Sequence, residues 1–148
     1  MFEPSKLMES ASVILYHKQS TSAMTRFFRL DDGPVVIGHP LAKLSRVVTG
    51  EVEPESTVVA HPGAIVAEIE RWLGLEPGDL EADAEYHELV EVPGKIIRIY
   101  LARFKTIDPP FAEAEAVQGS FVPLTQMRSA TSVELELLRT AYASIMEG

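Results

Sequence analysis

Residues 96–104 read IIRIYLARF, and this stretch decides the fold class. In an extended chain alternate residues point to opposite sides, and here both sides are apolar. The two sets are Ile97, Ile99 and Leu101 on one side, and Tyr100, Ala102 and Phe104 on the other. A strand that is apolar on both sides is usually central in its sheet and covered on both faces. We therefore expect an α+β protein in which a mixed sheet lies between helices.

The residues before this stretch predict a hairpin. Residues 80–92 alternate between apolar and mostly acidic side chains, which is typical of a half-buried strand. Pro93, Gly94 and Lys95 predict a three-residue turn into 96–104, and such a turn places Glu85 opposite Arg103. Residues 41–48 stay ambiguous between helix and strand. Further strands are predicted at 11–17, 24–30, 34–38, 57–60 and 120–122.

Two amphipathic patterns predict helices. In the first, apolar residues recur with helical spacing over 65–73, and Gly74 follows as a left-handed cap. Glu68, Glu70 and Arg71 are expected at its side or outside. The apolar face consists of Ile65, Val66, Ile69, Trp72 and Leu73.

The second helix begins after Thr131, whose spacing to Glu134 is that of a capping box. Between the hairpin and this helix, residues 105–115 contain two successive prolines and are predicted as a loop. The apolar face of the second helix consists of Leu135, Leu138, Ala141, Tyr142 and Ile145.

Length and composition exclude several classes of protein. The 148 residues suit one domain spanning 1–148, and the absence of cysteine excludes disulfides and thiolate zinc sites. No apolar run approaches the about 20 residues of a membrane span, and the first residues lack a signal-peptide pattern, so we expect a cytoplasmic protein. The net charge of -9 argues against nucleic acid as a partner.

The acidic excess is local, because residues 51–91 hold twelve acidic side chains and one basic one, Arg71. Such a run is most often a solvated face, and the alternative is a metal site with converging carboxylates. Motifs for serine hydrolases, phosphate loops, dinucleotide binding and zinc proteases are missing. The four histidines lack helical ligand spacing and are expected at the surface or at strand ends.

The order of elements resembles the Nudix hydrolase superfamily over about residues 50–146. Residues 67–104, AEIERWLGLEPGDLEADAEYHELVEVPGKIIRIYLARF, look like the second half of a Nudix box and the hairpin behind it. Residues 121–127 (FVPLTQM) and 134–142 (ELELLRTAY) are similar to the closing strand and last helix of many members. The resemblance implies a Nudix-like α/β/α sandwich and, if the protein is active, a pyrophosphohydrolase that uses Mg²⁺ or Mn²⁺.

The resemblance also implies candidate site residues. Each has a plain structural alternative: a solvated helix glutamate for Glu68, a surface ion pair for Arg71, and an acidic loop for Glu113 and Glu115. A working metal site requires Glu68 to share a cleft with at least two of the other candidate carboxylates. The candidates are Glu68 and Glu115 for catalysis, Arg71 and Glu113 for substrate binding, and Glu53, Glu55 and Glu68 for the metal.

The box itself departs from the family pattern. When Gly74 and Leu75 are aligned with its end, Glu68 takes the first glutamate position, but Arg71 and Trp72 replace the paired glutamates that bind metal. The sequence therefore predicts that the usual metal site is degraded. Two hypotheses remain: a domain that binds or hydrolyses a nucleoside-diphosphate-linked small molecule, and a non-catalytic module that binds a protein or an effector. A homodimer is left open.

Overall fold

The computed structural model of the chain describes residues 11–31, 33–38, 41, 45–48, 61–86, 88–127 and 130–147. Within these ranges eight strands form one sheet in the order β4-β6-β7-β1-β2-β8, while β3 pairs with β1 and β5 pairs with β7. The strands are β1 (Ala11–Lys18), β2 (Thr25–Leu30), β3 (Val36–Gly38), β4 (Arg46–Val47), β5 (Leu80–Ala82), β6 (Glu88–Val92), β7 (Lys95–Phe104) and β8 (Gly119–Val122).

The centre of the sheet is a parallel pair, β1 and β7, whose register runs from Ala11 opposite Arg98 to Tyr16 opposite Arg103. The other strand pairs in the described residues are antiparallel, so the sheet is mixed. The other edge of each central strand pairs with two further strands: β2 and β3 pair with β1, and β5 and β6 pair with β7. The central position predicted for 96–104 is confirmed.

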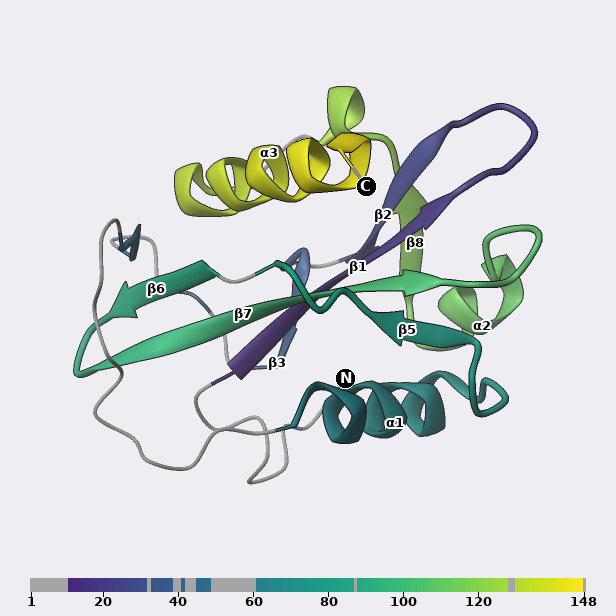
Figure 1. Cartoon of the computed structure of the whole chain (residues 1–148), viewed down its shortest axis with the longest axis horizontal. Helices are drawn as coiled ribbons and strands as arrows, with labels where there is room; N and C mark the ends of the chain where they lie inside the picture. Colours follow the sequence, from purple (N-terminus) through teal and green to yellow (C-terminus); the bar gives the residue numbers. More distant parts are fainter. Residues whose placement is uncertain are drawn as a thin grey trace.

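Helices cover both faces of this sheet (Figure 1). The helix α3 (Ser132–Glu147) packs on the face that carries Ile97, Ile99 and Leu101. The helix α1 (Pro62–Leu73) and the short α2 (Phe111–Ala116) pack on the opposite face, against Phe104 and its neighbours. A single 3-10 turn, η2 (Leu124–Gln126), precedes α3. The predicted α+β class, with a mixed sheet between helices, is confirmed. From α1 onward the elements follow the order that the Nudix resemblance implies, except that the predicted loop before β8 contains the helix α2.

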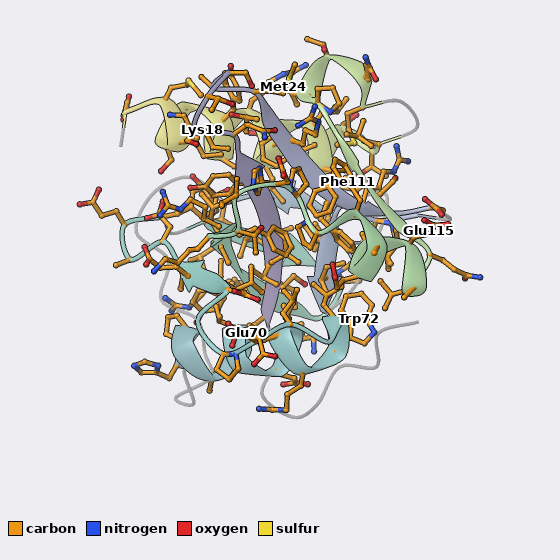
Figure 2. The ribbon with its side chains drawn as sticks, turned by 90° about the vertical axis from the view of Figure 1, so that its right-hand side faces the viewer. Lys18, Met24, Glu70, Trp72, Phe111 and Glu115 are labelled. Carbon is orange, nitrogen blue, oxygen red and sulfur yellow. The ribbon has the colours of Figure 1, made fainter. Side chains whose placement is uncertain are left out.

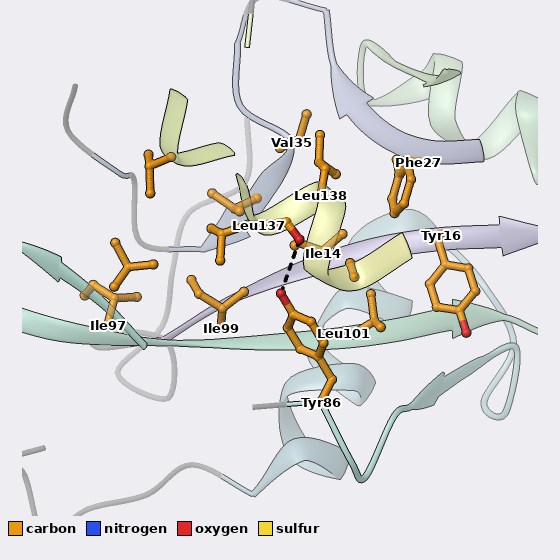
Figure 3. Close-up of a cluster of buried hydrophobic side chains, with 14 of the residues drawn as sticks. Ile14, Tyr16, Phe27, Val35, Tyr86, Ile97, Ile99, Leu101, Leu137 and Leu138 are labelled. Carbon is orange, nitrogen blue, oxygen red and sulfur yellow. Dashed lines mark hydrogen bonds between the residues drawn. The ribbon is translucent and has the colours of Figure 1, made fainter. Parts of the chain in front are cut away.

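The core on the α3 side is drawn in Figure 3. Leu137 and Leu138 of α3 lie over the apolar side chains of β1 and β7 and are fully buried. Tyr86 reaches α3 as well, because its hydroxyl donates to the Leu137 carbonyl at 3.4 Å and lies 3.0 Å from the Thr140 hydroxyl. Tyr142, predicted in the apolar face, is instead exposed. The buried face of α3 consists of Val133, Leu137, Leu138, Ala141 and Ile145.

Local capping explains where α1 begins and ends. His61 has an extended backbone, as expected before proline, and its Nδ1 accepts the Gly63 amide at 3.0 Å. At the other end Gly74 takes the left-handed conformation with φ 72°, and the Leu75 amide returns to the Glu70 carbonyl at 2.9 Å. The predicted helix and its glycine cap are confirmed.

The predicted capping box of α3 is also confirmed. The Thr131 hydroxyl accepts the Glu134 amide at 3.3 Å, and Glu134 Oε1 accepts the Thr131 amide at 3.0 Å. Glu134 is buried, and its Oε2 accepts the Val35 amide at 2.9 Å. One carboxylate thus closes the helix and holds the segment before β3.

Two details of the predicted hairpin are wrong. Residues 80–92 are two strands, because Asp83 Oδ1 accepts the amides of Glu85 and Tyr86 at 2.8 and 3.3 Å and turns the chain between them. The turn into β7 has two residues, Pro93 and Gly94, with Gly94 at φ 88°. Glu81, not Glu85, therefore lies opposite Arg103.

The segment 105–115 is not entirely a loop, because α2 begins within it at Phe111. Two successive prolines exclude a strand, whereas a proline is tolerated where a helix begins, since its missing amide would lack a partner there. Pro109 and Pro110 are both buried directly before α2. The predicted strand 57–60 and residues 42–44 lie outside the described residues. Among the helices described, none is long and apolar enough to cross a membrane.

Position 119 requires glycine because there is no room for a side chain, and a substitution tests this requirement. A Cβ added there would lie 2.6 Å from Cζ of Phe28, a fully buried ring. We expect Gly119→Ala to lower the free energy of unfolding by about 1–3 kcal/mol, the usual cost of overpacking a core. Urea unfolding measures this change. Gly33→Ala is the control, because a Cβ there meets no atom within 4 Å, and equal losses in both variants would contradict the steric explanation.

Candidate functional site

The candidate residues that the structure describes lie on α1 and α2, two helices that pack on one face of the sheet and contact each other. Glu68 and Trp72 are half-buried on α1, and Arg71 is exposed beside them. On α2, Glu113 is half-buried and Glu115 is exposed. Figure 2 shows Trp72 on α1 below α2, which carries Phe111 and Glu115. The structure thus brings together the helices that carry Glu68, Arg71, Glu113 and Glu115.

Trp72 packs into the core at this point. Its ring meets Phe28 nearly at a right angle, with centroids 6.1 Å apart, and Phe28 is fully buried. Edge-to-face contacts of this kind stabilise beyond the apolar area that they bury. The apolar environment agrees with the interpretation of Trp72 as a core residue. A carboxylate at this position would have to be desolvated against the ring of Phe28.

The contact continues as a connected group of aromatic rings that we call the aromatic cluster: Trp72, Phe28, Phe121, Phe104 and Phe111. Phe121 of β8 is at its centre. Its centroid lies 5.7 Å from Phe28, 5.3 Å from Phe104 and 5.8 Å from Phe111, with interplanar angles between 68° and 86°. Apolar rings therefore connect α1 to α2 across the face where the Nudix resemblance implies metal ligands.

The described residues do not fit a Nudix-type metal centre. Mg²⁺ and Mn²⁺ need several oxygen ligands that converge. Among the residues described, no group of three His, Asp or Glu side chains is placed so that it could hold a metal ion. Glu53 and Glu55, predicted as metal ligands, lie outside the described residues. Of the three predicted ligands, only Glu68 has a described position.

Glu70 has a structural role that the sequence analysis missed. It was expected at the side of α1 or outside, but its side chain is buried. Its Oε2 accepts the amides of Gly78 and Leu80 at 2.8 and 3.1 Å, which holds the connection from α1 to β5. Helical periodicity carries no signal for this role, because the two donors come from a turn whose path depends on the tertiary fold.

His17 lies at the end of β1, in agreement with the strand-end alternative predicted for the histidines, but it is fully buried and not at the surface. Its Nε2 lies 2.8 Å from the Thr106 carbonyl, and because a carbonyl only accepts, Nε2 carries the proton. Nδ1 has no hydrogen-bond partner among the described residues. Val13 and Leu15 of the same strand belong to the α1 side, so alternation puts His17 beneath the segment that leads to α2.

Burial and a like charge raise the pKa of one carboxyl group away from this site. Partial burial on β6 is the larger cause for Glu88, and the Glu136 carboxylate on α3 adds to it. Raised carboxyl pKa values often mark functional sites. Here the cause is the packing of α3 on the opposite face of the sheet, so the raised pKa does not point to the α1–α2 contact.

No known protein family and no curated protein matches the chain. Among solved structures, the crystal structure of the Ap4A hydrolase from C. elegans is similar. The two share 17% identity, the alignment covers 91% of this chain and 96% of that one, and the TM-score is 0.49.

The role of Glu70 is tested by two substitutions. We expect Glu70→Ala to lower the free energy of unfolding by about 1–3 kcal/mol, because the buried Leu80 amide loses its acceptor. Glu70→Gln keeps a carbonyl oxygen in the same place and should cost less. Chemical denaturation compares the two variants. A glutamine variant as unstable as the alanine variant would show that the charge, not the acceptor geometry, matters.

The raised pKa of Glu88 predicts that the stability of the protein depends on pH. The pKa of Glu88 in the folded protein lies above the ordinary value of 4.5, so the protonated carboxyl group stabilises the folded protein relative to the ionised one. This contribution to stability is complete below pH 4.5 and is lost as the pH rises through the folded pKa. We expect Glu88→Gln to be more stable than the wild type at pH 7 and equal to it near pH 4. Glu136→Gln removes the smaller cause and should show a weaker effect. Thermal unfolding across this pH range measures both, and parallel curves for Glu88→Gln and wild type would contradict the assignment.

Proposed function

We propose that this chain is a diverged Nudix-like domain that binds a nucleoside-diphosphate-linked small molecule without metal-dependent hydrolysis. The observation that carries the proposal is the packing of Trp72 against Phe28. Trp72 and Arg71 occupy the two positions where the resemblance implies the paired metal-binding glutamates. An indole in the core cannot serve as a ligand for a hard cation, because such cations take oxygen ligands.

A domain that has lost its metal-binding glutamates can retain nucleotide binding more easily than hydrolysis. Pyrophosphate hydrolysis of the Nudix type needs a metal to polarise the substrate and to activate water. Recognition of a diphosphate needs only hydrogen-bond donors and positive charge, and a guanidinium provides both. Arg71 is exposed on α1, and no ion pair to it is found within the described part of the chain. In this proposal Arg71 binds the diphosphate, and Glu68 is not a catalytic group.

A small ligand agrees with the electrostatics of the chain. The net charge of -9 disfavours a long polyanion, whose binding depends on neutralising many phosphates. One diphosphate needs only a local cation. In the acidic segment 51–91, Arg71 is the single basic residue, and it belongs to α1, the helix that contacts α2.

The second candidate is a non-catalytic module that binds a protein through the same end of the molecule. The observation that favours it is the exposure of two large apolar side chains, Ile107 and Phe111, in the segment around α2. Such side chains contribute strongly to protein interfaces when they are buried by a partner. Calorimetry with nucleotides distinguishes the candidates, since a protein-binding module has no reason to bind a nucleoside diphosphate.

The test is isothermal titration calorimetry with ADP and ADP-ribose, in EDTA and in millimolar Mg²⁺. We expect the same dissociation constant in both conditions and no hydrolysis product by chromatography. Arg71→Ala should weaken binding by about 10-fold, in the range of a charge-assisted hydrogen bond that is lost. Arg139→Ala is the matched control, because Arg139 is an exposed arginine on α3, which covers the opposite face.

Two results would contradict the proposal in different ways. Products that appear only with Mg²⁺ and vanish in Glu68→Gln would identify a metal-dependent hydrolase. No heat and no thermal shift with either ligand, in either condition, would reject nucleotide recognition and favour the protein-binding module, since a bound ligand must raise the apparent stability.

A further inference from the structure

Phe111 is an aromatic side chain that the fold leaves open to solvent. Its exposed fraction is 54%, whereas Phe28 and Phe104 of the same aromatic cluster are buried. Its ring stands against Phe121 at 86°, with centroids 5.8 Å apart. Figure 2 shows Phe111 and Glu115 on α2, above Trp72 on α1. The aromatic cluster therefore reaches the surface through this ring.

The exposure of Phe111 is not the result of a loosely attached segment. His17 holds the chain before α2 through the Thr106 carbonyl at 2.8 Å, and Gln19 donates to Asp108 Oδ1 at 2.7 Å. Pro109 and Pro110 are buried between these contacts and Phe111. The two prolines fix the backbone angle φ at successive positions, and the contact with His17 anchors the segment to β1. Together they orient the Phe111 ring before any ligand binds. A surface organised in advance loses less entropy on binding.

We propose that Phe111, supported by Phe121, is the platform on which the base of the bound nucleotide stacks. This inference rests on the proposed function and adds the part of the ligand that the ring recognises. A nucleobase presents a flat π-face that stacks on an aromatic ring, and one such contact contributes substantially to binding. Arg71 comes from α1, which contacts α2, and binds the diphosphate at the other end of the ligand.

Glu115 gives the platform a preference among bases. It lies four residues after Phe111 on α2, so the two side chains share one face of the helix. A carboxylate accepts hydrogen bonds from the exocyclic amino groups of adenine, guanine or cytosine, whereas uracil lacks an amino group and offers only its ring N3–H. The diphosphate is repelled by Glu115 and lies towards Arg71. The site therefore binds ADP more tightly than UDP.

The decisive variant is Phe111→Ala, with Ile107→Ala as its matched control. Ile107 belongs to the same segment and is 83% exposed, but it has no ring on which a base could stack. The ligands are ADP, UDP and inorganic pyrophosphate, measured by calorimetry. Trp72 is the only tryptophan, so its fluorescence gives a second, site-specific signal. Circular dichroism and thermal unfolding check that each variant is folded.

We expect Phe111→Ala to weaken ADP binding by about 10-fold or more, within the range for one stacked base. Ile107→Ala should bind ADP as the wild type does, and pyrophosphate should bind equally to all three proteins. Glu115→Gln should reduce the preference for ADP over UDP. Equal ADP binding by Phe111→Ala and wild type would overturn the platform and leave the proposed function standing. Equal losses in Phe111→Ala and Ile107→Ala would also overturn it, because they indicate a general apolar contact. Absence of ADP binding by the wild type would overturn both proposals.

Discussion

The parallel pairing of β1 with β7 is the constraint on which the rest of the structure depends. β1 is almost entirely buried and β7 is buried at six of its ten residues, and their side chains alternate between the two faces of the sheet. Burial of apolar surface stabilises a protein by about 25 cal/mol for each Å² removed from water, so each apolar face of the sheet requires a cover. α3 covers one and α1 with α2 covers the other. The short strands at the outer edges complete the hydrogen bonding of the central pair.

This arrangement also determines what the candidate site can do. The face of α1 that carries Trp72 lies against Phe28, in the core beside the central pair. A side chain at such a place is selected for packing, and carboxylates there would pay for desolvation unless a metal or hydrogen-bond donors compensated them. Trp72 and the aromatic cluster satisfy the packing instead. An exposed ring and a guanidinium remain at this part of the surface, and they agree with the proposed recognition of a nucleotide.

The acidic side chains of 51–91 that are described serve separate purposes. Glu70 accepts two backbone amides, and Glu91 and Glu81 form exposed ion pairs with Arg46 at 3.0 Å and Lys105 at 3.3 Å. Exposed pairs of this kind contribute only about 0–1 kcal/mol each. Glu88 faces α3, where burial and Glu136 raise its pKa. The carboxylates described in this segment are spread over α1, β5, β6 and the turns between them and do not converge.

The sequence by itself determined the elements whose pattern repeats along the chain. The two-sided apolar stretch of β7, the helical face and glycine cap of α1 and the capping box of α3 follow from local periodicity and local hydrogen bonds, so they could be predicted. Among the site residues, the same periodicity placed Trp72 on an apolar face. Tertiary structure alone decided the break at Asp83, the register that puts Glu81 opposite Arg103, the helix after Pro110, and the burial of Glu70 and His17. These features depend on partners that lie far away in the sequence or in a turn of undetermined path, and a local pattern of side chains does not specify which partner a buried polar group will meet.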